Sequence, residues 1–249
     1  MRVLITGATG LIGTEIVKQC HAKGIAVNYL TTNKSKILSE ENYKGFYWNT
    51  NASEINADCI KDVDAIIHLV GASISKRWTD KQKQAILDSR IKTTAFLHKV
   101  LENNPHNVSQ IIAASAIGFY PDSLTKYYKE SDTEVNDSFL GEVVHKWETA
   151  VDSFKSLNIT LSKIRIGIVF SSQGGAFPQL SKPVKYGVGA AMGTGKQWMS
   201  WVHIEDLTNI FMYTLEHKLE GIYNGVSPNP ATNAEVTKAI AKYVKRPLI

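Results

Sequence analysis

Three glycines near the amino terminus constrain this chain more than any other feature. Residues 2–6 (Arg-Val-Leu-Ile-Thr) predict a short strand, and an amphipathic helical pattern opens at Leu11. Gly7, Gly10 and Gly13 permit a tight strand-to-helix turn, close approach of the backbone to a pyrophosphate, and close packing of helix on strand. The positive end of that helix suits a phosphate. We therefore expect a dinucleotide here, with a purely structural turn as the alternative. The expected contacts are Gly7, Thr9, Gly10, Leu11, Ile12 and Gly13.

Strand-like and helix-like segments then alternate as in βαβ units. Expected strands cover 26–31, 45–48, 65–70, 110–115 and 160–164, and long helices cover 80–101 and 138–154. The continuous apolar run at 65–70 is typical of a strand buried on both faces of a parallel sheet. This pattern predicts an α/β fold, a Rossmann doubly wound parallel sheet with helices on both faces.

The domain organisation follows from where this alternation stops. Residues 1–165 are expected to form the NAD(P)-binding Rossmann domain, with 204–225 returning to it as a helix and a strand. Glycine-rich, irregular segments at 166–203 and 226–249 predict a small carboxy-terminal substrate lobe. The chain ends in Lys-Arg-Pro-Leu-Ile without a polar tail, and we expect this lobe to be truncated.

Composition narrows the classes of partner. The net charge is +5, but no run of five basic residues occurs, so a nucleic-acid partner is not expected. Cys20 and Cys59 lack metal-ligand spacing, which predicts a reduced, cytoplasmic setting and no metal. No apolar run reaches the roughly 18 residues of a membrane span, so no membrane association is expected.

The end of the second expected strand bears on the choice of dinucleotide. NAD-selective folds place an acidic residue about 20 residues past the glycine turn to hold the ribose 2′-hydroxyl. Here the sequence reads Thr31, Thr32, Asn33 and Lys34, with no carboxylate to repel a 2′-phosphate. These residues favour NADP(H) over NAD(H). A polar turn without a ligand is the alternative interpretation.

Several further motifs carry a family resemblance. They are the glycine turn, His68-Leu-Val-Gly-Ala, Ser89-Arg-Ile-Lys-Thr-Thr, Ser115-Ala-Ile-Gly-Phe-Tyr, Arg165-Ile-Gly-Ile-Val, and Gln197-Trp-Met-Ser-Trp-Val-His-Ile-Glu-Asp. The chain resembles the atypical branch of the extended short-chain dehydrogenase/reductases, usually labelled epimerase family proteins or NAD-dependent epimerase/dehydratase-like proteins. The resemblance implies an unknown small-molecule substrate and allows a homodimer through helices 80–101 and 138–154. It also implies further cofactor contacts at Leu69, Val70, Gly71, Arg90 and Val169.

The usual catalytic set of that superfamily is a Ser, an Asn and a Tyr-x-x-x-Lys pair, in which the tyrosine moves the proton. This sequence departs from it. Aligned on Glu148, the Tyr position holds Leu140 and the Lys position holds Val144, both within an apolar stripe at helical spacing. The ordinary proton relay is therefore expected to be absent.

Candidate catalytic residues remain at three positions, each with a structural alternative. Ser115 ends a strand and can instead satisfy the backbone, Arg90 replaces the usual Asn and can instead be a surface residue, and Tyr120 can instead pack in its loop. His68, in an apolar strand, is more typical of a core histidine than of a catalyst.

Two functions of different classes follow. The first is an NADP(H)-binding oxidoreductase or nucleotide-sugar epimerase-like enzyme in which Ser115 and Arg90 polarise a carbonyl. The second is a non-catalytic NADP(H)-binding or redox-sensing protein, favoured by the missing relay.

Overall fold

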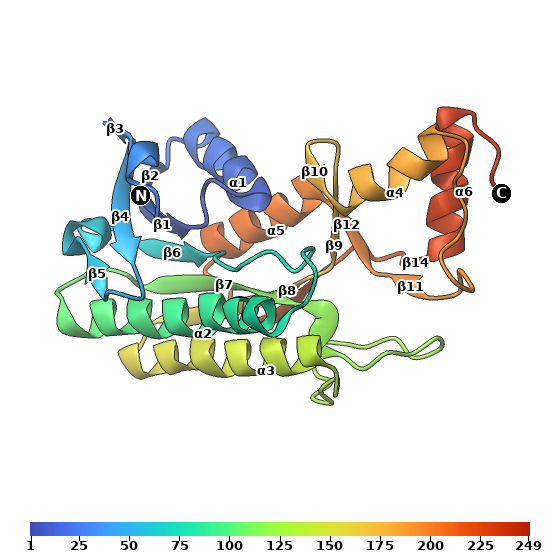
Figure 1. The fold of residues 1–249 in the computed structure, drawn as a ribbon. Helices are drawn as coiled ribbons and strands as arrows, with labels where there is room; N and C mark the ends of the chain where they lie inside the picture. Colours follow the sequence, from blue (N-terminus) through green and yellow to red (C-terminus); the bar gives the residue numbers. More distant parts are fainter.

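A mostly parallel sheet forms the centre of the computed structural model, which describes residues 1–249 (Figure 1). Its strands lie in the order β13–β8–β7–β6–β1–β2–β4–β3, all parallel except β3, and β5 pairs with β4. Their bounds are β1 (Arg2–Thr6), β2 (Ala26–Thr31), β3 (Ser39–Glu40), β4 (Tyr43–Asn49), β5 (Glu54–Ile55), β6 (Ala65–His68), β7 (Gln110–Ala116), β8 (Thr160–Ile166) and β13 (Gly221–Gly225).

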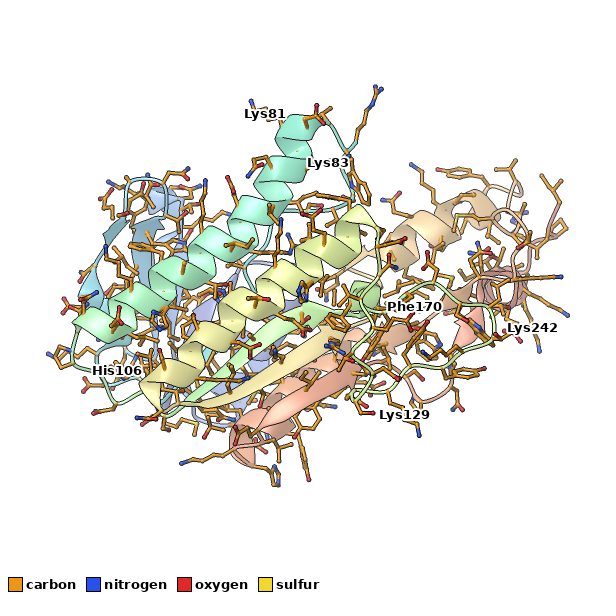
Figure 2. All side chains as sticks on the ribbon, turned by 90° about the horizontal axis from the view of Figure 1, so that it is seen from below. Lys81, Lys83, His106, Lys129, Phe170 and Lys242 are labelled. Atoms are coloured by element: carbon orange, nitrogen blue, oxygen red, sulfur yellow. The ribbon has the colours of Figure 1, made fainter.

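Helices cover both faces of this sheet. α1 (Leu11–Ala22) and α5 (Ile204–Glu216) pack together on one face, and α2 (Asp80–Asn103) and α3 (Phe139–Asp152) lie side by side on the other (Figures 1 and 2). Thr79 and Ser138 begin α2 and α3 as side-chain caps, accepting hydrogen bonds from the amides of Gln82 and Gly141. Short 3₁₀ turns occupy Lys34–Lys36, Ala57–Ile60, Ile117–Phe119 and Ser153–Leu157. The expected Rossmann class is confirmed.

The core lies where the central strands meet the helices. Ile66, Ile67, Ile111 and Ile112 are completely buried, as expected for strands covered on both faces. One difference from the sequence expectation concerns the strand at 65–70, because β6 ends at His68. The Leu69 amide donates to both the Thr6 carbonyl at 3.2 Å and the Thr6 hydroxyl at 3.0 Å, and the Val70 amide donates to that hydroxyl at 3.3 Å.

The glycine-rich regions form a small lobe with its own core. This lobe comprises β9 (Ile168–Ser171), β10 (Gly174–Gly175), α4 (Ala176–Lys185), β11 (Trp198–Met199), β12 (Trp201–His203), β14 (Ala231–Thr232) and α6 (Asn233–Val244). Val184, Met199, Val236, Ile240 and Ala241 form a cluster separate from the main core. The irregular sequence between 166 and 203 thus contains a helix and short strands that periodicity did not reveal.

The strand order reverses between β1 and β6, the two neighbours from which the chain proceeds in opposite directions across the sheet. In open α/β sheets, ligands bind beyond the carboxyl ends of the strands at such a switch point. The glycine turn after β1 and the segment after β6 both lie there.

Candidate functional site

The glycine turn leaves the start of α1 open. Gly7 has φ +76°, a left-handed conformation that favours glycine. A Cβ at position 13 would lie 2.3 Å from the Gly7 carbonyl oxygen, so only glycine lets α1 pack against the turn. Gly10 is the N-cap of α1, and no side chain caps the helix. Uncapped amides at the positive end of a helix, with no Cβ in front of them, fit a pyrophosphate.

A buried hydrogen-bond network fixes the facing segment after β6. The His68 ring bonds the Thr6 hydroxyl through Nδ1 at 2.9 Å and the Thr94 hydroxyl through Nε2 at 3.0 Å. Thr94 itself donates to the Arg90 carbonyl at 2.6 Å, so it accepts from His68 Nε2, and Nδ1 accepts from Thr6. Complete burial lowers the pKa of His68 to about 4, so the ring is neutral. His68 is thus a structural residue that ties β1 and β6 to α2.

Arg90 lies directly beneath the segment after β6. A Cβ at Gly71 would come within 3.0 Å of the Arg90 guanidinium, and Nη1 donates to the carbonyls of Ala72 and Ile86 at 3.3 and 3.0 Å. The guanidinium also lies 5.0 Å from the centre of the Trp147 ring. Burial lowers its pKa from the usual value, and no carboxylate pairs with it. The structure therefore places this cation at the switch point rather than on the free surface of α2.

The residues expected to select the dinucleotide fall into two groups. The Thr31 hydroxyl accepts from the amide of Asn33 at 3.1 Å, and Asn33 Oδ1 accepts from the amide and hydroxyl of Ser35. These two side chains therefore organise the turn. Thr32 and Lys34 are exposed, and Lys34 Nζ lies 4.5 Å over the Tyr47 ring. The groups free to meet a 2′-phosphate are thus those of Thr32 and Lys34 and the side-chain amide nitrogen of Asn33.

Val169 joins the same edge from the lobe. A Cβ at Gly175 would lie 3.1 Å from the Val169 carbonyl and 3.2 Å from the Leu11 side chain. Leu11, Ile12 and Val169 are half-buried, whereas Thr9 is exposed. The structure thus brings β9 next to the start of α1, so both sequence segments expected to contact cofactor lie together.

Ser115 lies at the end of β7, as expected, but its hydroxyl bonds a buried carboxylate. Its hydroxyl is buried and donates to Glu148 Oε1 at 2.5 Å. Glu148 also accepts from Arg165 Nε and Nη2 at 2.8 and 3.0 Å, and Lys163 lies 3.7 Å away. Burial acts to raise the pKa of Glu148, but the bonds from Arg165 and Ser115 and the nearby cations outweigh it and leave that pKa below its usual value. Ser115 thus satisfies a buried ion pair.

The positions where the superfamily has its Tyr-x-x-x-Lys pair are apolar in this chain. A Cβ at Gly118 would lie 4.0 Å from both Leu140 Cβ and Val144 Cγ2, so these three positions face one another. Val144 is buried against Phe119 and Tyr120, and Leu140 is half-buried. None of the three carries a group able to move a proton.

A cleft of 840 Å³ opens beside these positions, between the Rossmann body and the lobe. Gly118 and Leu140 lie in its wall, and the 120–138 loop and β11 supply most of its aromatic lining. The loop reaches the lobe, where Trp198 Nε1 donates to the Leu124 carbonyl at 2.9 Å. Both views show it running alongside the lobe, and Lys129 marks it in Figure 2.

Tyr120 is the one expected catalytic residue that lines this cleft. Its hydroxyl donates to Asn224 Oδ1 at 2.8 Å, and its ring lies 4.8 Å from the Arg165 guanidinium. Sequence reasoning did not identify Tyr127, Tyr128 or Trp198 as lining residues. A signal existed for Trp198, because it belongs to the Gln197–Asp206 motif.

Comparisons with known proteins agree with this geometry. A family model described as the NAD dependent epimerase/dehydratase family matches residues 3–140. An epimerase family protein of Staphylococcus saprophyticus is 34% identical over 90% of this chain and 74% of its own length. A chloroplastic homologue of SDR39U1 from Arabidopsis thaliana is 33% identical, covering 99% of this chain and 72% of that protein.

Solved structures give the same result. Human epimerase family protein SDR39U1, crystallised with NADPH, superposes with a TM-score of 0.84 at 28% identity, covering 99% of this chain and 81% of that one. A nucleoside-diphosphate sugar epimerase from Corynebacterium glutamicum superposes with a TM-score of 0.81 at 29% identity, covering 98% and 51%. The chain belongs to the NAD-dependent epimerase/dehydratase family, within the epimerase family proteins similar to SDR39U1. No helix in the structure combines the length and apolarity needed to cross a membrane.

Proposed function

We propose that this chain is an NADP(H)-binding oxidoreductase that acts on a small molecule held in the 840 Å³ cleft. One observation carries the proposal: the uncapped start of α1 and the ligand-sized cleft both open at the carboxyl edge of the sheet. The SDR39U1 structure with NADPH supports the choice of nicotinamide cofactor.

Each part of the cofactor has candidate residues. The 7–13 turn would hold the pyrophosphate, and Thr32 and Lys34 would hold the 2′-phosphate. Leu69–Gly71, Arg90 and Val169 would surround the nicotinamide half. A bound nicotinamide supplies hydride at its C4 position.

The chain's own residues would then act on the substrate carbonyl. Tyr120 is placed to donate a hydrogen bond into the cleft if its bond to Asn224 is exchanged for one to substrate. Arg90 is a cation without a carboxylate partner and would contribute electrostatic stabilisation. We assign Ser115 a structural role, because its only hydroxyl proton is committed to Glu148.

The first experiment tests cofactor binding through Gly10→Val. A Cβ there would already lie 3.2 Å from the Gly7 carbonyl oxygen, and the larger side chain would cover the start of α1. NADPH affinity, measured by titration calorimetry, should fall below detection while the urea unfolding transition persists. Unchanged affinity in a folded variant would remove the basis of the proposal.

The second experiment tests dinucleotide choice through Lys34→Glu. NADPH should bind more tightly than NADH to the natural chain, because a charge-assisted hydrogen bond contributes about 1.5–3 kcal/mol. Lys34→Glu should remove that preference by adding repulsion. Lys36→Glu is the matched control, since it makes the same charge change at an exposed lysine on the same 3₁₀ turn. Equal affinity of the natural chain for NADPH and NADH would show that Thr31–Lys34 form only a turn.

A non-catalytic NADP(H)-binding protein is the second candidate. The observation that favours it is the apolar set Gly118, Leu140 and Val144, which leaves the usual proton relay without a donor. Steady oxidation of NADPH with a carbonyl compound, lost on Tyr120→Phe, would support the enzyme. NADPH binding without turnover of any carbonyl or sugar-nucleotide substrate would support the binding protein.

A further inference from the structure

The walls of the cleft are aromatic. Tyr120 and Tyr128 stack with ring centres 5.3 Å apart and planes 14° from parallel, and Tyr127 lies 5.4 Å from Trp198. All four side chains line the cleft. Such faces bind flat or ring-shaped ligands through apolar contact and offset stacking.

The same walls contain few cationic groups that could bind an anion. Lys126 and Asp122 are the ionic residues among the lining side chains. Lys126 lies in an exposed pair with Glu134 at 3.1 Å, so a diphosphate would compete with that carboxylate for it, and Asp122 would repel a negative group. Arg165, beneath Tyr120 and outside the lining, gives Nε and Nη2 to Glu148, and its Nη1 is buried without a hydrogen-bond partner. A diphosphate is recognised by free cations and convergent donors, and its burial without them is costly.

The remaining polar groups in the cleft are neutral. Asn224 Oδ1 accepts from Tyr120, Asn136 Nδ2 donates to the Tyr120 carbonyl, and Gln197 Nε2 donates to the Met192 carbonyl. Amides, together with the hydroxyls of Ser123 and Ser227, supply donors and acceptors without charge. These groups match ketone or hydroxyl oxygens on an uncharged ligand.

We propose that the cleft binds a neutral, planar ring compound bearing carbonyl or hydroxyl groups, such as a cyclic ketone or quinone, and that it excludes nucleoside diphosphate sugars. This inference extends the proposed function by naming its substrate class. It separates the chain from the fold neighbours whose substrates carry a diphosphate, because the cleft of this chain contains no unpaired cation.

The test uses the whole chain, with and without NADPH, and two probes in titration calorimetry. The neutral probe is 9,10-phenanthrenequinone, and the anionic probe is UDP-glucose. The quinone should bind saturably, and UDP-glucose should give no heat at millimolar concentration. Trp198→Ala and Tyr127→Ala should each weaken quinone binding at least tenfold. Tighter binding of UDP-glucose than of the quinone would overturn the inference.

Two variants sharpen the result. Tyr243→Ala alters a separate apolar groove between α4 and α6 and should leave quinone affinity unchanged; if it weakens binding instead, the quinone lies in that groove and the inference is wrong. Glu134→Gln releases Lys126 and should make UDP-glucose binding detectable without changing quinone affinity. If UDP-glucose binding stays undetectable in that variant, the pairing of Lys126 is not what excludes the diphosphate, and the inference loses its basis. Failure of NADPH to bind, with quinone bound normally, would refute the proposed function alone.

Discussion

The β1–α1 turn and the region where the end of β7 meets the start of α3, here called the β7–α3 junction, lie at the same edge of one sheet. They differ in whether they carry the groups that their function in the superfamily requires. The turn has a glycine with φ +76° and a helix start without a side-chain cap, which are the backbone features that a pyrophosphate needs. At the junction, Gly118, Leu140 and Val144 face one another. Nearby, Glu148 forms a buried ion pair with Arg165 and accepts the hydrogen bond of Ser115. Cofactor binding depends on backbone shape, whereas proton transfer depends on side chains. The first can persist where the second has been replaced.

The largest expected effect comes from breaking the buried ion pair. Glu148→Leu should lower the free energy of unfolding by about 3–5 kcal/mol, because the buried Arg165 loses its counter-charge, whereas Lys163 keeps Asp152 at 3.0 Å. Urea denaturation measures this change. Glu142→Gln, which breaks an exposed pair with Lys146, is the control and should leave the midpoint in place. If both variants unfold alike, the junction is not held by its buried charges.

Restoring the two relay residues one at a time compares Leu140 with Val144, which share one face of α3. Val144→Lys should destabilise the chain by about 3 kcal/mol or more, since the new ammonium would be buried beside Phe119 and Tyr120, over which the Arg165 cation is stacked. Leu140→Tyr should cost less than about 1 kcal/mol, because Leu140 lines the cleft and the new hydroxyl can reach solvent. Thermal unfolding compares the two. A stable Val144→Lys variant that still binds NADPH would mean that this face accepts the relay after all.

Whether a feature could be predicted from the sequence depends on how far apart along the chain its interacting residues lie. The turn was predicted because its evidence is local: a strand, three glycines and a helix within residues 2–22. The bond from Ser115 to Glu148 was not, because the two residues lie 33 positions apart and meet only once β7 and α3 are packed together. The aromatic cleft depends on a bond between residues 74 positions apart. Leu140 and Val144 lie between these cases: helical spacing predicted a shared face, but not that Leu140 borders a cleft while Val144 is buried.

As the pH is lowered, the first loss of stability should come from His68, which joins β1 and β6. His68 has a folded pKa of about 4 against an ordinary 6.5, so the unfolded chain binds its proton more readily. Stability should therefore fall as pH drops from about 6.5 to 4, by about 3 kcal/mol at 1.36 kcal/mol per pKa unit. The carboxylate of Glu148, whose pKa is lowered, keeps its contribution above the unfolded value and loses it only as pH falls further through the folded pKa. Urea denaturation at several pH values measures both windows.

Two histidine variants test whether His68 causes the loss of stability between pH 6.5 and 4. His68→Leu should be less stable at neutral pH, since the Thr6 hydroxyl loses its acceptor, but its stability should vary little between pH 6.5 and 4. His217→Asn alters an exposed histidine and should keep the natural slope. If the slope survives in His68→Leu, another group governs the acid response and the neutral ring does not hold β6 in place.

A truncation at Leu140 tests whether this residue has any part in chemistry. Leu140→Ala should cost about 1–2 kcal/mol, below the roughly 2–5 kcal/mol of a fully buried leucine, because the side chain is only half-buried and the cleft already adjoins it. NADPH affinity should not change, since the cofactor turn lies on the other side of the switch point. Any oxidation of NADPH that the natural chain supports should also continue, because the aliphatic side chain of leucine moves no proton. A tenfold loss of turnover with unchanged NADPH affinity would show that Leu140 orients the substrate. The β7–α3 junction would then be a reshaped part of the site, with an apolar positioning contact where the superfamily places a proton donor.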